Sequence, residues 1–296
     1  MAEEKNRVIG GMLYLVATPI GNMSDISARA IKVLSEVDFV AAEDTRNTMR
    51  LLGCLDIKQR LISYHEHNRR ERGEEIINRL SLGESCALVT DAGMPAISDP
   101  GADLVKLCAE RGIPVTVIPG CCAAVTALAL SGLSTTRFSF EGFLPVDGGE
   151  RKKRLAEIAH ERRTMIFYEA PHKLIRTLGD LLSTFGDRKI AICRELTKIN
   201  EEILRTTLEG AVALYHEKKP RGEYVLIVEG GEEAGAALPA MEQDPTADMT
   251  PEERVDYYCR TQGVARMAAM KLVAKDMGIS KSELYRMLLP GDEEKS

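Results

Sequence analysis

Charged side chains follow two apolar runs of the sequence, where they could carry acid–base chemistry. One group is "AEDTR" at 42–46, which offers Glu43, Asp44 and Arg46, and the other is "RELTKINEE" at 194–202. A carboxylate can receive a proton, and a lysine or arginine can orient a phosphate or a hydroxyl group. An equally good interpretation is that these residues form structural ion pairs around the end of a strand.

Four loops rich in glycine and proline form a second kind of candidate site. They are "ATPIGN" (17–22), "TDAGMPAISDPG" (90–101), "IPGCCAA" (118–124) and "YEAPHK" (168–173). Glycine allows a ligand to approach backbone amides closely, and proline fixes φ and gives a rigid wall. Any one of these loops could be a tight turn. Several of them at the same edge of a sheet indicate a shared ligand crevice.

The loops do not match the common phosphate-binding sequences. Neither G-x-G-x-x-G nor G-x-x-x-x-G-K-[ST] occurs in them, so we expect a nucleoside-like or small zwitterionic ligand. Asp91 stands at a strand end, where it could accept hydrogen bonds, whereas Asp99 precedes "PGADL" and is better interpreted as a helix N-cap. His65 and His67 are two residues apart without a third ligand at a suitable spacing, so no metal site is expected.

Strands and helices alternate along the segments that would position these loops. Continuous apolar runs predict strands at 12–18, 38–44, 60–67, 86–91 and 113–120. Helices are predicted between them, the first with Ser24 or Asp25 as its N-cap. Because the apolar runs are continuous rather than alternating, they predict a mostly parallel sheet with both faces covered.

The same alternation starts again after "FSFEGFLP" (138–145) and divides the chain. Strand candidates there are 163–171, 188–196 and 222–231. We therefore predict an α/β fold with two α/β domains and a cleft between them, followed by a small helical extension. The predicted limits are 1–122 for the N-terminal domain, 123–235 for the second domain, 236–251 for a linker and 252–296 for the extension.

Composition and charge narrow the class of protein. With 296 residues the chain can form two ordinary domains, and no apolar run approaches the roughly 20 residues of a membrane helix. The charged N-terminus and the seven cysteines without a C-x-x-C pair favour reduced thiols in a cytoplasmic protein. A net charge of -6 argues against a surface uniformly built for nucleic acid but allows local basic clusters such as "RKKR" at 151–154.

Nine stretches between residues 12 and 230 together resemble one family. They are "LYLVATPIGN", "AAEDTRNTMRLL", "SYHEHN", "VTDAGMPAISDPG", "IPGCCAAVTALALSGL", "EGFLP", "FYEAPHKL", "CRELTKINEEILRTTLEG" and "RGEYVLIVEG". In this order they are similar to the ribosomal RNA small-subunit methyltransferase I family of the tetrapyrrole-methylase superfamily. The resemblance implies S-adenosylmethionine as methyl donor and the ribose 2′-hydroxyl of a cytidine in small-subunit (16S) rRNA as acceptor. It also implies a homodimer with the donor between two α/β domains, acting on free rRNA or the assembled 30S subunit, and no membrane or DNA partner.

Carried onto this chain, the resemblance implies a set of donor-binding residues. They are Pro19, Ile20, Asp91, Ala92, Gly93, Pro95, Ser98, Gly120, Cys121, Ala123, Tyr168 and Glu223. For the acceptor, we hypothesise that Lys198 or Arg46 orients the phosphate or ribose, while Asp44 or Glu201 receives the hydroxyl proton. The sequence departs from the family pattern at Met94, Cys121, Cys122 and Asn200, where Thr, Pro, Ser and His are usual. Asn200 weakens a role for an imidazole base at that position.

The extension at 252–296 resembles a helix-turn-helix. Its first helix carries an apolar stripe of Val264, Met267, Ala268 and Leu272, and Ser280 would cap a second helix whose apolar face holds Leu284, Met287 and Leu288. Basic side chains at Arg266, Lys271, Lys275, Lys281 and Arg286 could contact RNA phosphates. Packing of the helices on the body or on a partner copy explains the pattern equally well.

Two other functions remain open. A related enzyme of the superfamily would methylate a porphyrinoid carbon, and it would need a wide apolar pocket without basic clusters. A non-catalytic RNA-binding protein with a degraded site is the third possibility. The stretches "EDTR", "YHEHN" and "RKKR" favour RNA, and the intact loops at every expected strand end favour an enzyme.

Overall fold

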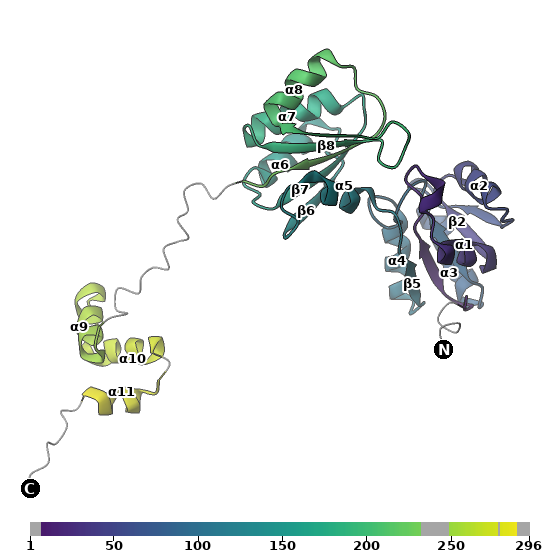
Figure 1. Ribbon diagram of the computed structural model, residues 1–296. Helices are drawn as coiled ribbons and strands as arrows, with labels where there is room; N and C mark the ends of the chain where they lie inside the picture. The colour runs from purple at the N-terminus through teal and green to yellow at the C-terminus, as the bar shows by residue number, and fades with distance from the viewer. Residues whose placement is uncertain (1–6, 232–248, 278, 289–296) are drawn as a thin grey trace, which may run out of the picture. The chain divides into compact units, whose positions relative to one another are not determined.

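The computed structural model describes residues 7–231, 249–277 and 279–288. They fall into two compact units, Met1–Glu232 and Glu233–Ser296. The larger unit carries two five-stranded sheets with their helices, and helices α9 to α11 belong to the smaller one (Figure 1). Within the described ranges, no helix has both the length and the apolar character needed to cross a membrane.

The first sheet is parallel throughout, in the order β3-β2-β4-β1-β5. Its strands are β1 (Leu13–Val16), β2 (Phe39–Ala42), β3 (Leu61–Ser63), β4 (Cys86–Val89) and β5 (Val115–Ile118). Helices α1 (Ala28–Glu36), α2 (Thr45–Cys54), α3 (Arg69–Ser81) and α4 (Gly101–Glu110) connect them. Alternate residues of each strand enter two separate buried clusters, one on each face. The expected parallel sheet with both faces covered is confirmed.

Helix α1 begins later than the sequence indicated. Its N-cap is Ser27, whose Oγ accepts a hydrogen bond from the amide of Ala30 at 3.1 Å, so the assignment to Ser24 or Asp25 is wrong. Those two residues lie in the short 3₁₀ helix η2 (Met23–Asp25). The side chain of Asn22 accepts from the amide of Ser24 at 3.0 Å and so caps this earlier turn. Two polar caps in succession give a bend before α1.

The second sheet has the order β6-β7-β10-β8-β9 and is largely antiparallel. Its strands are β6 (Phe138–Gly142), β7 (Thr164–Glu169), β8 (Lys189–Arg194), β9 (Glu202–Thr207) and β10 (Tyr224–Val228). Only β6 and β7 are parallel neighbours, so parallel pairing does not extend from the first sheet to this one. Since β9 follows β8 through a short loop, the two strands must run in opposite directions.

Helix α5 (Ala123–Ser131) covers one face of the second sheet, although it follows a strand of the first. The other face carries α6 (Gly148–Ile158), α7 (Leu174–Phe185) and α8 (Leu208–Glu217). Figure 1 shows α5 at the point where the chain passes from one sheet to the other. The proposed domain limits at 122 and 235 stay predictions, but this packing places the start of the second layer close to residue 123.

The smaller unit has its own apolar cluster, formed by α9 (Pro251–Gln262), α10 (Arg266–Asp276) and α11 (Lys281–Leu288). Helix α10 buries Ala269, Met270, Val273 and Ala274. Of the expected stripe, Val264 packs against this cluster and Leu272 is half-buried, but Met267 is 58% exposed and Ala268 is also exposed, so those two assignments are wrong. Packing against α9 determines which face of α10 is buried, and the sequence pattern of α10 alone does not indicate this contact. In α11 Leu284 is buried as expected, but Met287 is exposed.

Ser280 caps α11 as predicted, because its Oγ accepts from the amide of Glu283 at 3.3 Å. Most of the predicted linker at 236–251, the turn residue Gly278 and the chain end after residue 288 lie outside the described residues.

Candidate functional site

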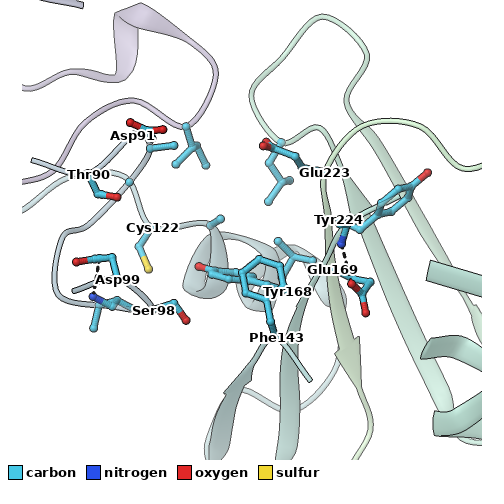
Figure 2. A pocket seen from close by; sticks show the side chains of 18 of the residues that line it. Thr90, Asp91, Ser98, Asp99, Cys122, Phe143, Tyr168, Glu169, Glu223 and Tyr224 are labelled. Carbon is cyan, nitrogen blue, oxygen red and sulfur yellow. Dashed lines mark hydrogen bonds between the residues drawn. The ribbon is translucent and has the colours of Figure 1, made fainter. Parts of the chain in front are cut away.

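A cavity of about 580 Å³ opens between the loops of the two sheets. The lining residues are Ile20, Glu43, Thr90, Asp91, Ala92, Gly93, Met94, Ile97, Ser98, Asp99, Cys122, Ala123, Phe143, Tyr168, Glu169, Ala170, Pro171, His172, Cys193, Leu196, Lys198, Glu223, Tyr224 and Val225. All four of the glycine- and proline-rich loops contribute to it. Figure 2 shows Asp91 and Ser98 on one side of the cavity and Tyr168 and Phe143 on the other.

Backbone contacts join the loop after β1 to the loop after β4. The amide of Thr18 donates to the carbonyl of Gly93 at 3.0 Å, and the amide of Gly93 donates back to Thr18 at 3.1 Å. Gly93 has a φ of 86°, and a Cβ at this position would lie 3.3 Å from Cγ2 of Ile20. A side chain here would be both strained and crowded, which explains why the cavity wall is bare backbone.

The carboxylate of Asp99 organises the rest of the loop after β4. It accepts hydrogen bonds from the amides of Ala96 at 3.0 Å, Ile97 at 3.2 Å and Gly101 at 2.7 Å. Ala96 and Ser98 have φ values of 67° and 66°, which non-glycine residues rarely adopt. The N-cap of α4 is Pro100, so the assignment of Asp99 as N-cap is wrong by one residue. The carboxylate of Asp99 nevertheless accepts from the first amide of α4, and it holds the strained loop in place.

Tyr168 builds the wall that faces this loop. Its hydroxyl oxygen accepts from the amide of Ala124 at 3.2 Å, at the start of α5. Its ring packs edge-on against Phe140 and Phe143, with centroids 5.0 and 5.6 Å away. Burial, with a smaller contribution from Cys122, raises the pKa of Tyr168 to about 12, so the phenol stays neutral. The result is an aromatic wall suited to a planar ring.

A lysine held by two carboxylates lies at the edge of the cavity. Nζ of Lys198 donates to Glu195 at 2.9 Å and to Glu223 at 2.7 Å, while the amide of Glu223 donates to Glu195 at 2.9 Å. Burial alone would lower the pKa of Lys198, but the two carboxylates raise it above its ordinary value. The ammonium group therefore stays charged and can stabilise negative charge that develops on a nearby oxygen.

Acidic side chains gather at the ends of β2 and β4. Asn47 donates to Asp91 at 3.0 Å, and the hydroxyl of Thr90 donates to Glu43 at 2.7 Å. Desolvation raises the pKa of Asp91, and the charges of Glu43 and Asp44 raise it further against the hydrogen bond from Asn47. A carboxylate with a raised pKa is a stronger base than an ordinary aspartate.

Three of the predicted catalytic residues do not line the cavity. Asp44 caps α2 and accepts hydrogen bonds from the amide and the guanidinium of Arg46, each at 2.8 Å. These bonds lower the pKa of Asp44 to about 2, which makes it a weak base. Glu201 accepts from the amide of Thr197 at 2.7 Å and closes the loop between β8 and β9. Their catalytic roles stay predictions.

The predicted donor-binding residues divide in a similar way. Those that line the cavity are Ile20, Asp91, Ala92, Gly93, Ser98, Ala123, Tyr168 and Glu223. Pro19, Pro95, Gly120 and Cys121 are their chain neighbours and do not line it themselves. A Cβ on Gly120 would lie 2.9 Å from Cβ of Ala17, so this glycine lets the loop after β5 pass close to β1.

Several lining residues were missed by the sequence analysis. Phe143 stands in "EGFLP" and His172 in "YEAPHK", so both were inside stretches already singled out. Cys193 and Val225 lie on β8 and β10, and Leu196 lies in the loop after β8. An apolar residue in or beside a strand shows only that it is buried. No local signal distinguishes these residues from the core.

Two other clusters from the sequence have structural roles. In "RKKR", Arg151 is 4% exposed and donates to Asp180 at 2.7 Å, so it does not serve a basic surface patch. The rings of His65 and His67 meet edge-on with centroids 6.0 Å apart. Across the described ranges, no group of three or more potential metal-ligating side chains occurs.

Comparisons with known proteins agree on one family. The family described as Tetrapyrrole (Corrin/Porphyrin) Methylases matches residues 12–212. Proteins named Ribosomal RNA small subunit methyltransferase I are similar over nearly the whole chain. That of Halalkalibacterium halodurans is 48% identical and covers 94% of both chains. That of Synechocystis sp. is 42% identical over 94% of this chain and 98% of its own. That of Bacillus subtilis is 44% identical over 93% of each.

Solved structures of lower identity share the fold. Uroporphyrin-III-C-methyltransferase from Thermus thermophilus is 20% identical with a TM-score of 0.53, over 73% of this chain and 94% of that chain. Diphthine synthase is 12% identical with a TM-score of 0.55, over 74% and 89%. At such identities the likeness concerns the architecture of the larger unit and not the substrate.

Proposed function

Because the chain belongs to the ribosomal RNA small subunit methyltransferase I family of the tetrapyrrole methylases, we propose that it methylates small-subunit ribosomal RNA. The donor is S-adenosylmethionine, and the acceptor is the ribose 2′-hydroxyl of a cytidine. The observation that carries the proposal is the cavity of about 580 Å³ between the two sheets, walled by bare backbone and one aromatic face. The protein acts in the cytoplasm as a homodimer, on free rRNA or on the assembled 30S subunit.

The residues of the cavity fit the donor. Its volume lies within the roughly 300–1,000 Å³ of small-molecule sites. Tyr168 and Phe143 offer an aromatic wall for adenine, and the backbone around Gly93 has no side chain to block a close approach. Asp91 offers a carboxylate to the ribose hydroxyls or the amine. When bound, S-adenosylmethionine supplies an electrophilic methyl carbon on a sulfonium.

The protein's part in the chemistry is to position and to stabilise charge. An acceptor oxygen held in line with the methyl carbon needs little further help, since positioning alone contributes roughly 7–11 kcal/mol. Lys198 supports the oxygen as it loses its proton, because its two carboxylate partners keep it charged. Asp91 is better suited than Asp44 to receive that proton, since its pKa is raised while that of Asp44 is held at about 2. In this scheme Arg46 orients RNA, and Glu201 holds the loop that carries Lys198.

A transfer assay tests the proposal. The protein is incubated with methyl-labelled donor and with bare rRNA, assembled small subunits or a uroporphyrinoid in separate reactions. We expect label in the ribose of an RNA cytidine and none in the uroporphyrinoid. Label in the uroporphyrinoid alone would show that the protein is a porphyrinoid methyltransferase instead. Label in none of the three substrates would contradict both enzyme functions and favour a non-catalytic protein.

A pair of lysine variants tests the site. Lys198→Ala is expected to lower kcat by roughly 100-fold or more, as removal of one charge-stabilising group does in other enzymes. Lys189→Ala is the matched control, because Lys189 is an exposed lysine at the other end of β8 that pairs with Glu229 at 3.3 Å. Equal activities of the two variants would remove Lys198 from the mechanism.

A further inference from the structure

A second hollow, of about 250 Å³, adjoins the donor cavity. It is lined by Thr18, Pro19, Gly21, Met23, Asn47, Thr48, Arg50, Leu51, Cys54, Thr90 and Asp91. Thr90 and Asp91 line both spaces, so they form a common wall. Pro19 and Asp91 already have proposed roles toward the donor, whereas the residues of α2 that line this space have none.

One face of helix α2 lines the hollow together with the loop after β1. Asn47, Arg50, Leu51 and Cys54 follow the spacing i, i+3, i+4 and i+7, which brings side chains to one face of a helix. Asn47 joins this face to the common wall through its hydrogen bond to Asp91 at 3.0 Å. The face is therefore fixed relative to the residue that borders the donor.

The charges around the hollow suit a nucleic-acid strand. Arg50 is exposed, and its guanidinium contacts Oδ1 of Asn47 at 3.5 Å. Within the described ranges no carboxylate pairs with Arg50, whereas Arg46 on the same helix is engaged by Asp44. An arginine without a carboxylate partner can bind a phosphate through two parallel hydrogen bonds. Met23, Leu51 and Cys54 supply a surface of low polarity for a sugar or base.

We propose that this hollow seats the acceptor RNA strand, with Arg50 on a phosphate beside the target ribose. The inference rests on the proposed function and assigns its acceptor side. Methyl transfer requires the acceptor oxygen to reach the methyl carbon from the side opposite the sulfur, so the donor and acceptor spaces must meet at one boundary. The wall shared by Thr90 and Asp91 is such a boundary, and the raised pKa of Asp91 suits it to a hydroxyl proton.

The salt dependence of RNA binding tests the role of Arg50. Affinity for small-subunit rRNA, or for the 30S subunit if only that is methylated, is measured over a range of salt for wild type and Arg50→Gln. One lost phosphate contact lowers the slope of log K against log salt by roughly 0.7–0.9. Binding of adenosylhomocysteine, measured by calorimetry, is expected to be unchanged. The matched control is Arg137→Gln, an exposed arginine just before β6, which should keep the wild-type slope.

Cys54 gives an independent readout that needs no substitution. It is exposed and lines the hollow, whereas Cys122 lines the donor cavity. Alkylation by iodoacetamide, followed by mass spectrometry, reports each thiol separately. RNA is expected to slow the modification of Cys54 several-fold, and adenosylhomocysteine is expected to protect Cys122 without protecting Cys54.

The outcomes separate this inference from the proposed function. If wild type does not methylate rRNA, the proposed function fails. If wild type methylates rRNA while Arg50→Gln keeps the full salt slope and RNA leaves Cys54 reactive, the acceptor assignment is overturned and the proposed function stands. A third outcome would instead assign the hollow to a second copy of the chain. In that case Cys54 becomes more protected as the protein concentration rises without RNA, and Arg50→Gln changes the oligomeric state.

Discussion

The close approach of two loops at Gly21 gives the sharpest test of the site geometry. A Cβ on Gly21 would lie 2.4 Å from Cγ of Lys198, 2.9 Å from Oγ1 of Thr197 and 3.1 Å from the carbonyl oxygen of Leu196. The carbonyl oxygen of Leu196 is a backbone atom of the loop after β8 and cannot move aside by itself. In that loop Glu195 and Thr197 already have positive φ. Gly21→Ala must therefore push the loop after β1 away from the loop that carries Lys198.

The expected cost follows from overpacking. Forcing one methyl into a filled contact costs about 1–3 kcal/mol. In a chain of this size each kcal/mol lowers Tm by roughly 2–4 °C, so a fall of about 2–12 °C is expected. Displacement of Lys198 by about 1 Å should lower kcat/KM by roughly 100-fold. Differential scanning fluorimetry and the labelled-donor assay measure the two effects.

A second glycine provides the control for this variant. Gly179 lies inside α7, where an added Cβ meets nothing within 4 Å. Gly179→Ala should raise stability by about 0.5–1 kcal/mol, because alanine favours the helix over glycine, and leave activity unchanged. If Gly21→Ala keeps a Tm within about 1 °C of wild type and full activity, the two loops do not meet as described and the proposed placement of Lys198 is refuted.

Three further predictions concern the acid wall, the aromatic wall and the helical extension. Asp91→Asn should raise Tm at pH 7 while lowering activity, because the raised pKa means that ionised Asp91 costs stability above that pKa. The gain should vanish as the pH falls to about 4 or below, and a Tm gain independent of pH would contradict this. Tyr168→Phe leaves the amide of Ala124 without its acceptor, so we expect a loss of about 0.5–1.5 kcal/mol in thermal denaturation and weaker binding of adenosylhomocysteine in calorimetry. An unchanged affinity would show that the wall does not depend on this bond. Deletion of residues 245–296 should reduce the salt slope of RNA binding without changing donor affinity, and an unchanged slope would favour packing on the body or a partner.

The first sheet could be predicted from sequence because its signals are local. Each strand is a short continuous apolar run, and a helix follows before the next strand, so parallel pairing with both faces covered is the arrangement that buries them. The start of α4 could be placed within one residue, since the prediction named Asp99 and the N-cap is Pro100. The start of α1 could not, since Asn22, Ser24, Asp25 and Ser27 are all acceptable caps and tertiary packing decides among them.

The second sheet and the smaller unit depend on contacts that the sequence does not show locally. Strand β9 is only partly buried at the sheet edge, so "EILRTT" lacks the apolar run that identified the other strands. In α10 nearly every face carries an apolar residue, and the choice of Ala269 and Val273 over Met267 comes from the neighbouring helix α9. Only the partner can determine which of several apolar faces becomes buried.

The main-chain hydrogen bonds around the cavity also explain why departures from the family pattern can occur at its wall. Met94 and Cys122 both line the cavity at positions where Thr and Ser are usual. The backbone pair between Thr18 and Gly93 and the three amides bound by Asp99 hold this wall without any contribution from those two side chains. A wall fixed by main-chain hydrogen bonds keeps its shape when a neighbouring side chain changes, whereas replacing Gly93 or Asp99 would alter the backbone itself. At these positions glycine and aspartate therefore determine where the chain runs.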